Sequence, residues 1–180
     1  MTERAQAILV VGPQSSGTRL VTEILVKNGC VGSYDHVQPF DVKPIVGDPI
    51  VWRRSVPHDS TWLDFRTMRT RLPDYDIQVV VVTRDFFALA QSQLNNHHAA
   101  NMNGAIQDIQ KAYRSIFREL TWTGLPFVTV SYESLIMDSE QTQERLCFHL
   151  GLTFFGPVPI ANQNERRWLE YGQEEVTLVG

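Results

Sequence analysis

The residues best suited to chemistry lie in one short run, residues 8–20 (Ile-Leu-Val-Val-Gly-Pro-Gln-Ser-Ser-Gly-Thr-Arg-Leu). Gly12 and Gly17 have the G-x-x-x-x-G spacing of a phosphate-binding loop, in which backbone N–H groups and a helix N-terminus surround an anion. In an NTPase, a lysine follows the second glycine and reaches the transferred phosphate. Here Thr18 and Arg19 follow it. The spacing therefore predicts a phosphate cradle that lacks the NTPase lysine.

A second pair of candidates follows the strongest strand pattern, residues 77–83 (Ile-Gln-Val-Val-Val-Val-Thr). Arg84 comes directly after this run, and Ser92 falls about two turns into the helix expected over residues 85–95. An arginine fork beside a hydroxyl is a good receptor for a phosphate group. The alternative is that Arg84 forms a surface salt bridge and Ser92 has no role.

The elements that must position these residues alternate along the chain. Hydrophobic periodicity predicts strands over 7–11, 49–53, 77–83 and 126–131, and helices over 17–28, 60–71, 85–95, 103–121 and 134–150. In the second of these helices, Ser60 is the expected N-cap, and Trp62, Phe65 and Met68 are expected to face inward. Alternating strands and helices predict one domain over residues 1–180, a three-layer α/β/α fold with a mainly parallel sheet, similar to P-loop NTPases. Ligands of such sheets bind beyond the carboxyl ends of the strands, where the loop and Arg84 would meet.

Composition excludes several classes of function. The formal net charge of −4 does not favour nucleic acid or an anionic membrane as a partner. The sequence has no run of 18 apolar residues and no signal-peptide pattern at its start, so we expect a soluble, cytoplasmic protein. Cys30 and Cys147 are far apart and belong to no His/Cys cluster, which predicts two buried thiols and no metal site.

Taken together, these motifs resemble the sulfotransferases that use 3′-phosphoadenosine 5′-phosphosulfate (PAPS). In that family the 5′-phosphosulfate is bound by a loop with the pattern P-[KR]-[ST]-G-[TS]-[TS]. An Arg followed eight positions later by a Ser binds the 3′-phosphate. Ser16-Gly17-Thr18 matches the loop, and Arg84 and Ser92 match the second motif. A third, weaker similarity is residues 128–135 (Val-Thr-Val-Ser-Tyr-Glu-Ser-Leu) with a following helix that closes in His-Leu-Gly-Leu.

The resemblance, which spans roughly residues 8–152, implies a sulfotransferase-like fold and transfer of a sulfuryl group from PAPS to a hydroxyl or amine. The acceptor would be a small molecule or carbohydrate, the product adenosine 3′,5′-bisphosphate, and no metal would be required. A partner copy of the chain, in a homo-oligomer, could contribute to the acceptor pocket. The residues assigned to the cofactor are Gly12, Gln14, Ser15, Ser16, Gly17, Thr18, Arg19, Arg84 and Ser92.

The sequence also departs from the family. Ser15 stands where the family has a catalytic Lys or Arg, so the charge would have to come from Arg19 or from one of Arg53 and Arg54. Strand alternation lets only one of those last two face a ligand.

The general base and the acceptor contacts are less clearly marked. Candidates for the base are Asp35 and His36 in the loop after the first helix, with His58 second. The alternative for either histidine is a surface residue or one that caps the core. Arg53, Arg54 and His58 are the candidates for acceptor binding, with a solvent-exposed strand end as the alternative for the two arginines. The pair at 97–98 is expected to be a solvated helix end.

Two other functions stay open. One is a P-loop phosphotransferase, which lacks its lysine here and has only Asp85 near the expected position of a strand-end aspartate. Magnesium dependence would identify it, because phosphoryl transfer needs the metal. The other is a catalytically inactive nucleotide-binding protein of the sulfotransferase fold, suggested by Ser15.

Overall fold

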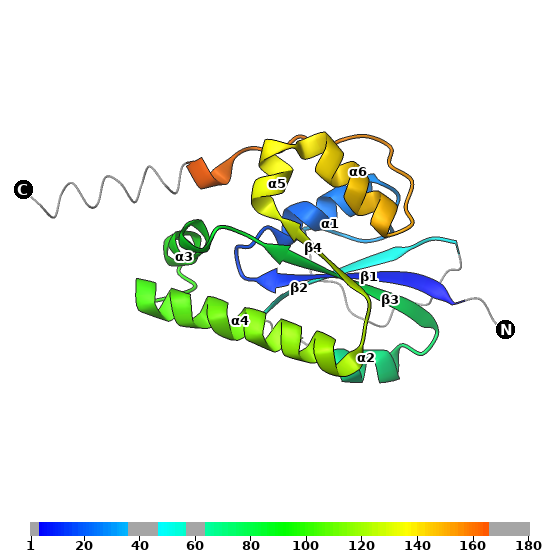
Figure 1. Cartoon of the computed structure of the whole chain (residues 1–180), viewed down its shortest axis with the longest axis horizontal. Coiled ribbons are helices and arrows are strands. Elements are labelled where there is room, and N and C mark those ends of the chain that lie inside the picture. The colour runs from blue at the N-terminus through cyan, green and yellow to red at the C-terminus, as the bar shows by residue number, and fades with distance from the viewer. Residues whose placement is uncertain (1–3, 36–46, 57–63, 166–180) are drawn as a thin grey trace, which may run out of the picture.

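The computed structural model describes residues 4–35, 47–56 and 64–165, and every structural statement concerns these ranges. The strands are β1 (Ala5–Pro13), β2 (Ile50–Val56), β3 (Tyr75–Thr83) and β4 (Phe127–Ser131). The helices are α1 (Thr18–Lys27), α2 (Phe65–Arg71), α3 (Phe86–Asn95), α4 (Met102–Thr123), α5 (Tyr132–Met137) and α6 (Ser139–His149). The predicted alternation of strands and helices is therefore confirmed (Figure 1).

The strands form a four-stranded, all-parallel sheet in the order β2-β1-β3-β4. The register aligns Val11 near the end of β1 with Arg54 of β2 and with Val81 of β3. All four carboxyl ends therefore lie along one edge of the sheet. That edge carries the turn after β1 and the residue that follows β3, Arg84.

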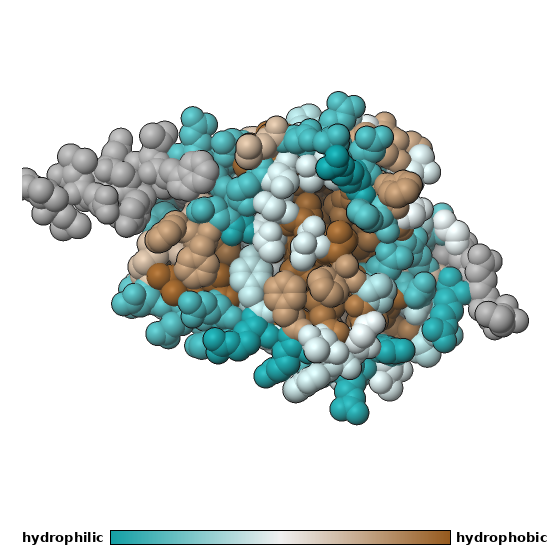
Figure 2. Space-filling model, viewed as in Figure 1, coloured by the Kyte–Doolittle hydropathy of each residue, from teal (hydrophilic) through white to brown (hydrophobic). Residues whose placement is uncertain are grey.

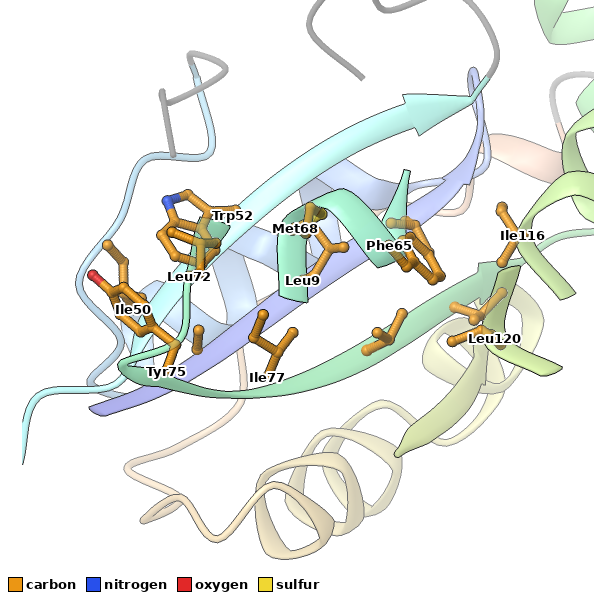
Figure 3. Packing of buried hydrophobic residues seen from close by; sticks show 14 of the residues in the cluster. Leu9, Ile50, Trp52, Phe65, Met68, Leu72, Tyr75, Ile77, Ile116 and Leu120 are labelled. Atoms are coloured by element: carbon orange, nitrogen blue, oxygen red, sulfur yellow. The ribbon is translucent and has the colours of Figure 1, made fainter. Parts of the chain in front are cut away.

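Helices cover both faces of the sheet, with α1, α5 and α6 on one side and α2 and α4 on the other (Figure 1). Because side chains alternate along a strand, Leu9 and Val11 pack against α2 and α4 while Ile8 and Val10 pack against α1. Figure 3 shows the hydrophobic cluster between the sheet and helices α2 and α4, with Phe65 of α2 over the sheet. A sheet buried on both faces explains why its central strands read as continuous apolar runs.

Two further features concern helix α3 and the outer strand β4. Helix α3 packs against the amino-terminal half of α4 through Leu89, Ala90, Ala105 and Ile109. Strand β4 forms one edge of the sheet, and apolar residues gather on the face that carries it (Figure 2). Phe127 is half exposed there, with its ring 6.1 Å from that of Phe117.

Two of the predicted helices are wrong, one at its start and the other because it is split in two. Helix α2 begins at Phe65, and its N-cap is Asp64 rather than Ser60, because the Asp64 side chain accepts a hydrogen bond from Thr67 N–H. Ser60 and Trp62 lie outside the described residues. The predicted helix over 134–150 is two helices, since Asp138 has φ −140° and ψ 67°, values that no α-helix contains. The first of them starts early because Ser131 caps it by accepting from Glu133 N–H and Ser134 N–H.

No helix in the described part of the chain is both long and apolar enough to cross a membrane.

Candidate functional site

A cavity of about 640 Å³ opens at the carboxyl edge of the sheet. Its wall combines the β1–α1 turn, the ends of β2 and β3, the end of α3, and the segment after α6. The predicted site residues that line it are Gln14, Ser15, Gly17, Thr18, Arg19, Arg53, Arg84 and Ser92. A larger hollow, of about 940 Å³, lies between α2 and the last turns of α4 and includes none of the predicted site residues that the structure describes.

The β1–α1 turn points an uncapped helix end at this cavity. Ser15 and Gly17 both have left-handed backbones, with φ 69° and 103°. Gly17 is the N-cap of α1 and offers no side-chain acceptor. Among the described helices, a side chain caps α2, α3, α4 and α5 but not α1 or α6. The N–H groups of the first turn of α1 therefore lack a capping side chain, and the positive end of the helix dipole faces the cavity.

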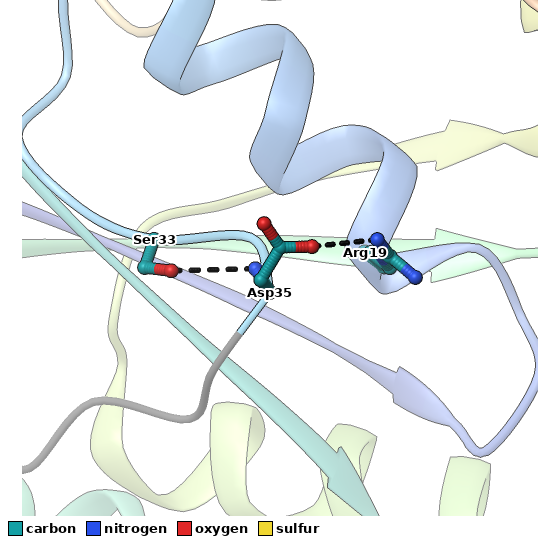
Figure 4. A network of polar contacts seen from close by, with 3 residues as sticks. All are labelled: Arg19, Ser33 and Asp35. Carbon is teal, nitrogen blue, oxygen red and sulfur yellow. Dashed lines mark hydrogen bonds and ion pairs between the residues drawn. The ribbon is translucent and has the colours of Figure 1, made fainter.

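The charges on the cavity wall differ in sign from the protein as a whole. The chain carries a formal charge of −4. Among the described residues that line this cavity, three are arginines (Arg19, Arg53 and Arg84) and one, Glu23, is acidic. Arg19 is partly neutralised, because its Nη2 lies 2.6 Å from Oδ1 of Asp35 in an exposed ion pair (Figure 4). Arginines and a helix N-terminus around one cavity suit an anionic ligand.

Arg84 is held in place from several sides. Its Nη1 donates to the Ser15 carbonyl at 2.9 Å, and its Nε donates to Oδ1 of Asn164 at 2.7 Å. Its Cζ lies 4.6 Å from the centre of the Tyr132 ring. The guanidinium thus connects the β1–α1 turn to the segment after α6.

Ser92 lies on the same cavity wall, as its spacing from Arg84 predicted. Asn96 reaches both Ser92 Oγ, at 3.3 Å, and Ser15 Oγ, at 3.5 Å. The end of α3 therefore lies directly against the β1–α1 turn.

Glu133 holds two neighbours of Arg84, Asp85 and Asn164, by hydrogen bonds. Its carboxylate accepts hydrogen bonds from Asp85 N–H at 2.8 Å, Ser131 Oγ at 2.8 Å and Asn164 Nδ2 at 2.6 Å. Burial alone would raise the pKa of this carboxyl, but these hydrogen bonds outweigh burial and the pKa lies below its ordinary value. Glu133 is therefore a carboxylate at neutral pH.

His98 is a cavity residue that the sequence prediction missed. The pair at 97–98 was expected to be a solvated helix end, and His97 is indeed exposed. His97 has a left-handed backbone with φ 56°, and the chain turns so that His98 lines the cavity. There the side-chain amide nitrogen of Gln14 lies 2.8 Å from His98 Nε2, and Gln93 Nε2 donates to the Gln14 carbonyl at 2.9 Å.

Other predicted site residues lie away from the cavity wall. Gly12 and Ser16 are not among the lining residues; Ser16 is fully buried, and a Cβ atom added to Gly12 would collide with Ser16 Oγ. Arg54 is 1% exposed and donates from Nη1 to the Arg53 carbonyl at 2.7 Å. Only Arg53 of that pair lines the cavity, as strand alternation predicted. His36 and His58 lie outside the described residues.

No group of three or more His, Cys, Asp or Glu side chains in residues 4–35, 47–56 and 64–165 is arranged to hold a metal ion. No protein-family model and no curated protein matches the chain. Any functional assignment therefore depends on this chain's own residues.

Proposed function

We propose that this protein is a sulfotransferase that uses PAPS to transfer a sulfuryl group to a hydroxyl or amine of a small-molecule or carbohydrate acceptor. The observation that supports this most is that the β1–α1 turn, Arg84 and Ser92 line one cavity. Its volume of about 640 Å³ falls within the roughly 300–1,000 Å³ typical of small-ligand sites. Its arginines and the N-terminus of α1 suit an anionic ligand.

Different parts of the cavity wall bind the two ends of the nucleotide. The first-turn N–H groups of α1 and the Thr18 hydroxyl bind the 5′-phosphosulfate end, where the helix dipole favours negative charge. Arg84 and Ser92 bind the 3′-phosphate. When bound, PAPS supplies the sulfuryl group and leaves as adenosine 3′,5′-bisphosphate.

Charge and proton transfer fall to the remaining polar residues. Ser15 carries no charge, so Arg19 and Arg53 are the cations proposed to stabilise negative charge on the departing oxygen. As the acceptor oxygen or nitrogen bonds to sulfur, its proton passes to a base. Asp35 is paired with Arg19, so His98 joins His36 and His58 as a candidate for that base.

Calorimetric titration tests the proposal directly. We expect adenosine 3′,5′-bisphosphate to bind with micromolar affinity and without magnesium, and ATP with magnesium not to bind. Tighter binding of ATP with magnesium would instead favour the phosphotransferase.

Replacing Arg84 tests how the two ends of the nucleotide are recognised. Arg84→Ala should weaken binding of the bisphosphate by about 30-fold or more, because charge-assisted hydrogen bonds contribute roughly 1.5–3 kcal/mol each. Binding of adenosine 5′-phosphate should fall by only about fivefold, the cost of losing one hydrogen bond to Ser15. Titrations of both nucleotides measure this, with Arg118→Ala on α4 as the control. Equal weakening of both nucleotides would mean that Arg84 does not read the 3′-phosphate.

The uncharged Ser15 favours a second candidate, a nucleotide-binding protein without turnover. Tight binding of the bisphosphate with no release of it from PAPS, over a range of acceptors, would identify that function.

A further inference from the structure

We propose that Asn164 is a positioning residue that keeps the charge of Arg84 directed to the cavity by separating it from Glu133. This inference rests on the proposed function, in which Arg84 binds the 3′-phosphate of a nucleotide. It assigns a role in nucleotide recognition to the segment after α6.

Asn164 lies between opposite charges and bonds to both. Its Oδ1 accepts from Arg84 Nε at 2.7 Å, and its Nδ2 donates to Glu133 Oε1 at 2.6 Å. The orientation of the amide is set by chemistry, because a flipped amide would place NH₂ against the guanidinium and oxygen against the carboxylate. The residue is 1% exposed, so water does not replace either contact.

The separation matters because Arg84 and Glu133 would otherwise attract each other. A partly buried arginine and carboxylate in contact, as Arg84 and Glu133 would be, can form a bidentate ion pair. Such a pair would draw the guanidinium away from the cavity and satisfy the donors that an anionic ligand needs. With Asn164 in place, Glu133 is satisfied by Asp85 N–H, Ser131 and the Asn164 amide.

The segment that carries Asn164 is also anchored by hydrogen bonds that do not involve Arg84. Tyr132 Oη donates to the Ala161 carbonyl at 3.0 Å and accepts from Gln163 N–H at 3.2 Å. The Asn162 side chain accepts from Asn164 N–H at 3.0 Å. Asn164 is therefore presented to Arg84 by a fixed backbone, as a positioning role requires.

The first test compares two variants of the same segment. Asn164→Ala should weaken binding of adenosine 3′,5′-bisphosphate about tenfold and change binding of adenosine 5′-phosphate less than twofold. Glu165→Ala, an exposed neighbour, should change neither. In the Arg84→Ala background, Asn164→Ala should cause no further loss, because it acts through Arg84. The same tenfold loss in that background, or unchanged affinity in the single variant, would overturn the proposal.

A restoring substitution separates this role from a merely structural one. In the Asn164→Ala protein, Glu133→Gln removes the competing carboxylate and should recover at least threefold of the lost bisphosphate affinity. No recovery would count against the separation of charges, because a packing defect at residue 164 would not be repaired at residue 133.

NMR of the Arg84 Nε–H group tests the geometry without a nucleotide. We expect the Arg84 Nε–H proton to exchange slowly with solvent in the wild type and in Glu165→Ala. In Asn164→Ala we expect its signal to be shifted or its exchange to be faster. An identical signal in all three proteins would overturn the role of Asn164. A wild type that binds neither nucleotide would instead overturn the proposed function, and the NMR result alone would then decide the role of Asn164.

Discussion

At the scale of single residues, the β1–α1 turn depends on a glycine for two reasons. Gly17 has φ 103°, a conformation that costs an L-residue roughly 1–2 kcal/mol. A Cβ atom there would also lie 3.0 Å from Cδ2 of Tyr132, the residue under Arg84. A side chain at position 17 would therefore disturb the turn and Arg84 together.

Gly17→Val should abolish binding of both adenosine nucleotides, because the side chain blocks the approach of an anion to the backbone. The matched control is Gly124→Val, which has a similar backbone with φ 62° but no atom within 4 Å of its Cβ position. Both variants should lose about 1–2 kcal/mol of stability from the left-handed backbone alone, and only the first should lose binding in calorimetry. Normal binding by Gly17→Val would show that the turn has a structural role alone.

At the scale of elements, caps decide where the helices begin. Asp64 Oδ1 accepts from Thr67 N–H at 2.6 Å and its Oδ2 from Thr67 Oγ1 at 2.8 Å. The backbone hydrogen bond from Thr67, followed by its hydroxyl, lowers the pKa of the Asp64 carboxyl. The cap positions Phe65 and Met68 over the sheet.

Asp64→Ala should lower the free energy of unfolding by about 1 kcal/mol at pH 7, the usual cost of losing an N-cap. Asp64→Asn retains a capping oxygen, so its free energy of unfolding should fall by only a few tenths of a kcal/mol. Because the folded pKa lies below the unfolded value, the contribution of the charge is present above the unfolded pKa and disappears as pH falls through the folded pKa. Urea denaturation at pH 7 and pH 3 measures this. If the difference in free energy of unfolding between wild type and Asp64→Asn is as large at pH 3 as at pH 7, the charge of Asp64 does not contribute to the cap.

At the scale of the whole molecule, the two-sided core excludes water from both cysteines. Cys30 belongs to the cluster under α1, and Cys147 of α6 is fully buried. Burial raises the pKa of Cys30 to about 12 and that of Cys147 to about 11. The reactive thiolate is therefore scarce at pH 8 in the folded protein.

Both thiols should react with Ellman's reagent at least about 100-fold more slowly in the native protein at pH 8 than in urea, since reaction requires opening of the fold. The variants Cys30→Ser and Cys147→Ser assign the two rates. Fast reaction of one thiol in the folded state would show that its side of the core opens locally.

Local pattern was enough to predict the parallel α/β architecture and the meeting of the β1–α1 turn with Arg84 and Ser92. Apolar periodicity, turn glycines and the residues that follow a strand all act within a short window. Once the strands are parallel, their carboxyl ends must share an edge. The alternation that separates Arg53 from Arg54 is equally local.

Other features depend on contacts that no short window contains. His98 reaches Gln14 because His97 adopts a left-handed backbone. The hydrophobic pattern of a helix continues from α5 to α6 across Asp138, although the backbone at Asp138 is not helical. Asn164 meets Arg84 across 80 positions of sequence. The sequence by itself determined the sheet and the edge at which its loops meet, because backbone sterics and hydrophobic periodicity are local. Only the tertiary structure decided which side chains line the cavity, because that depends on how separate elements pack.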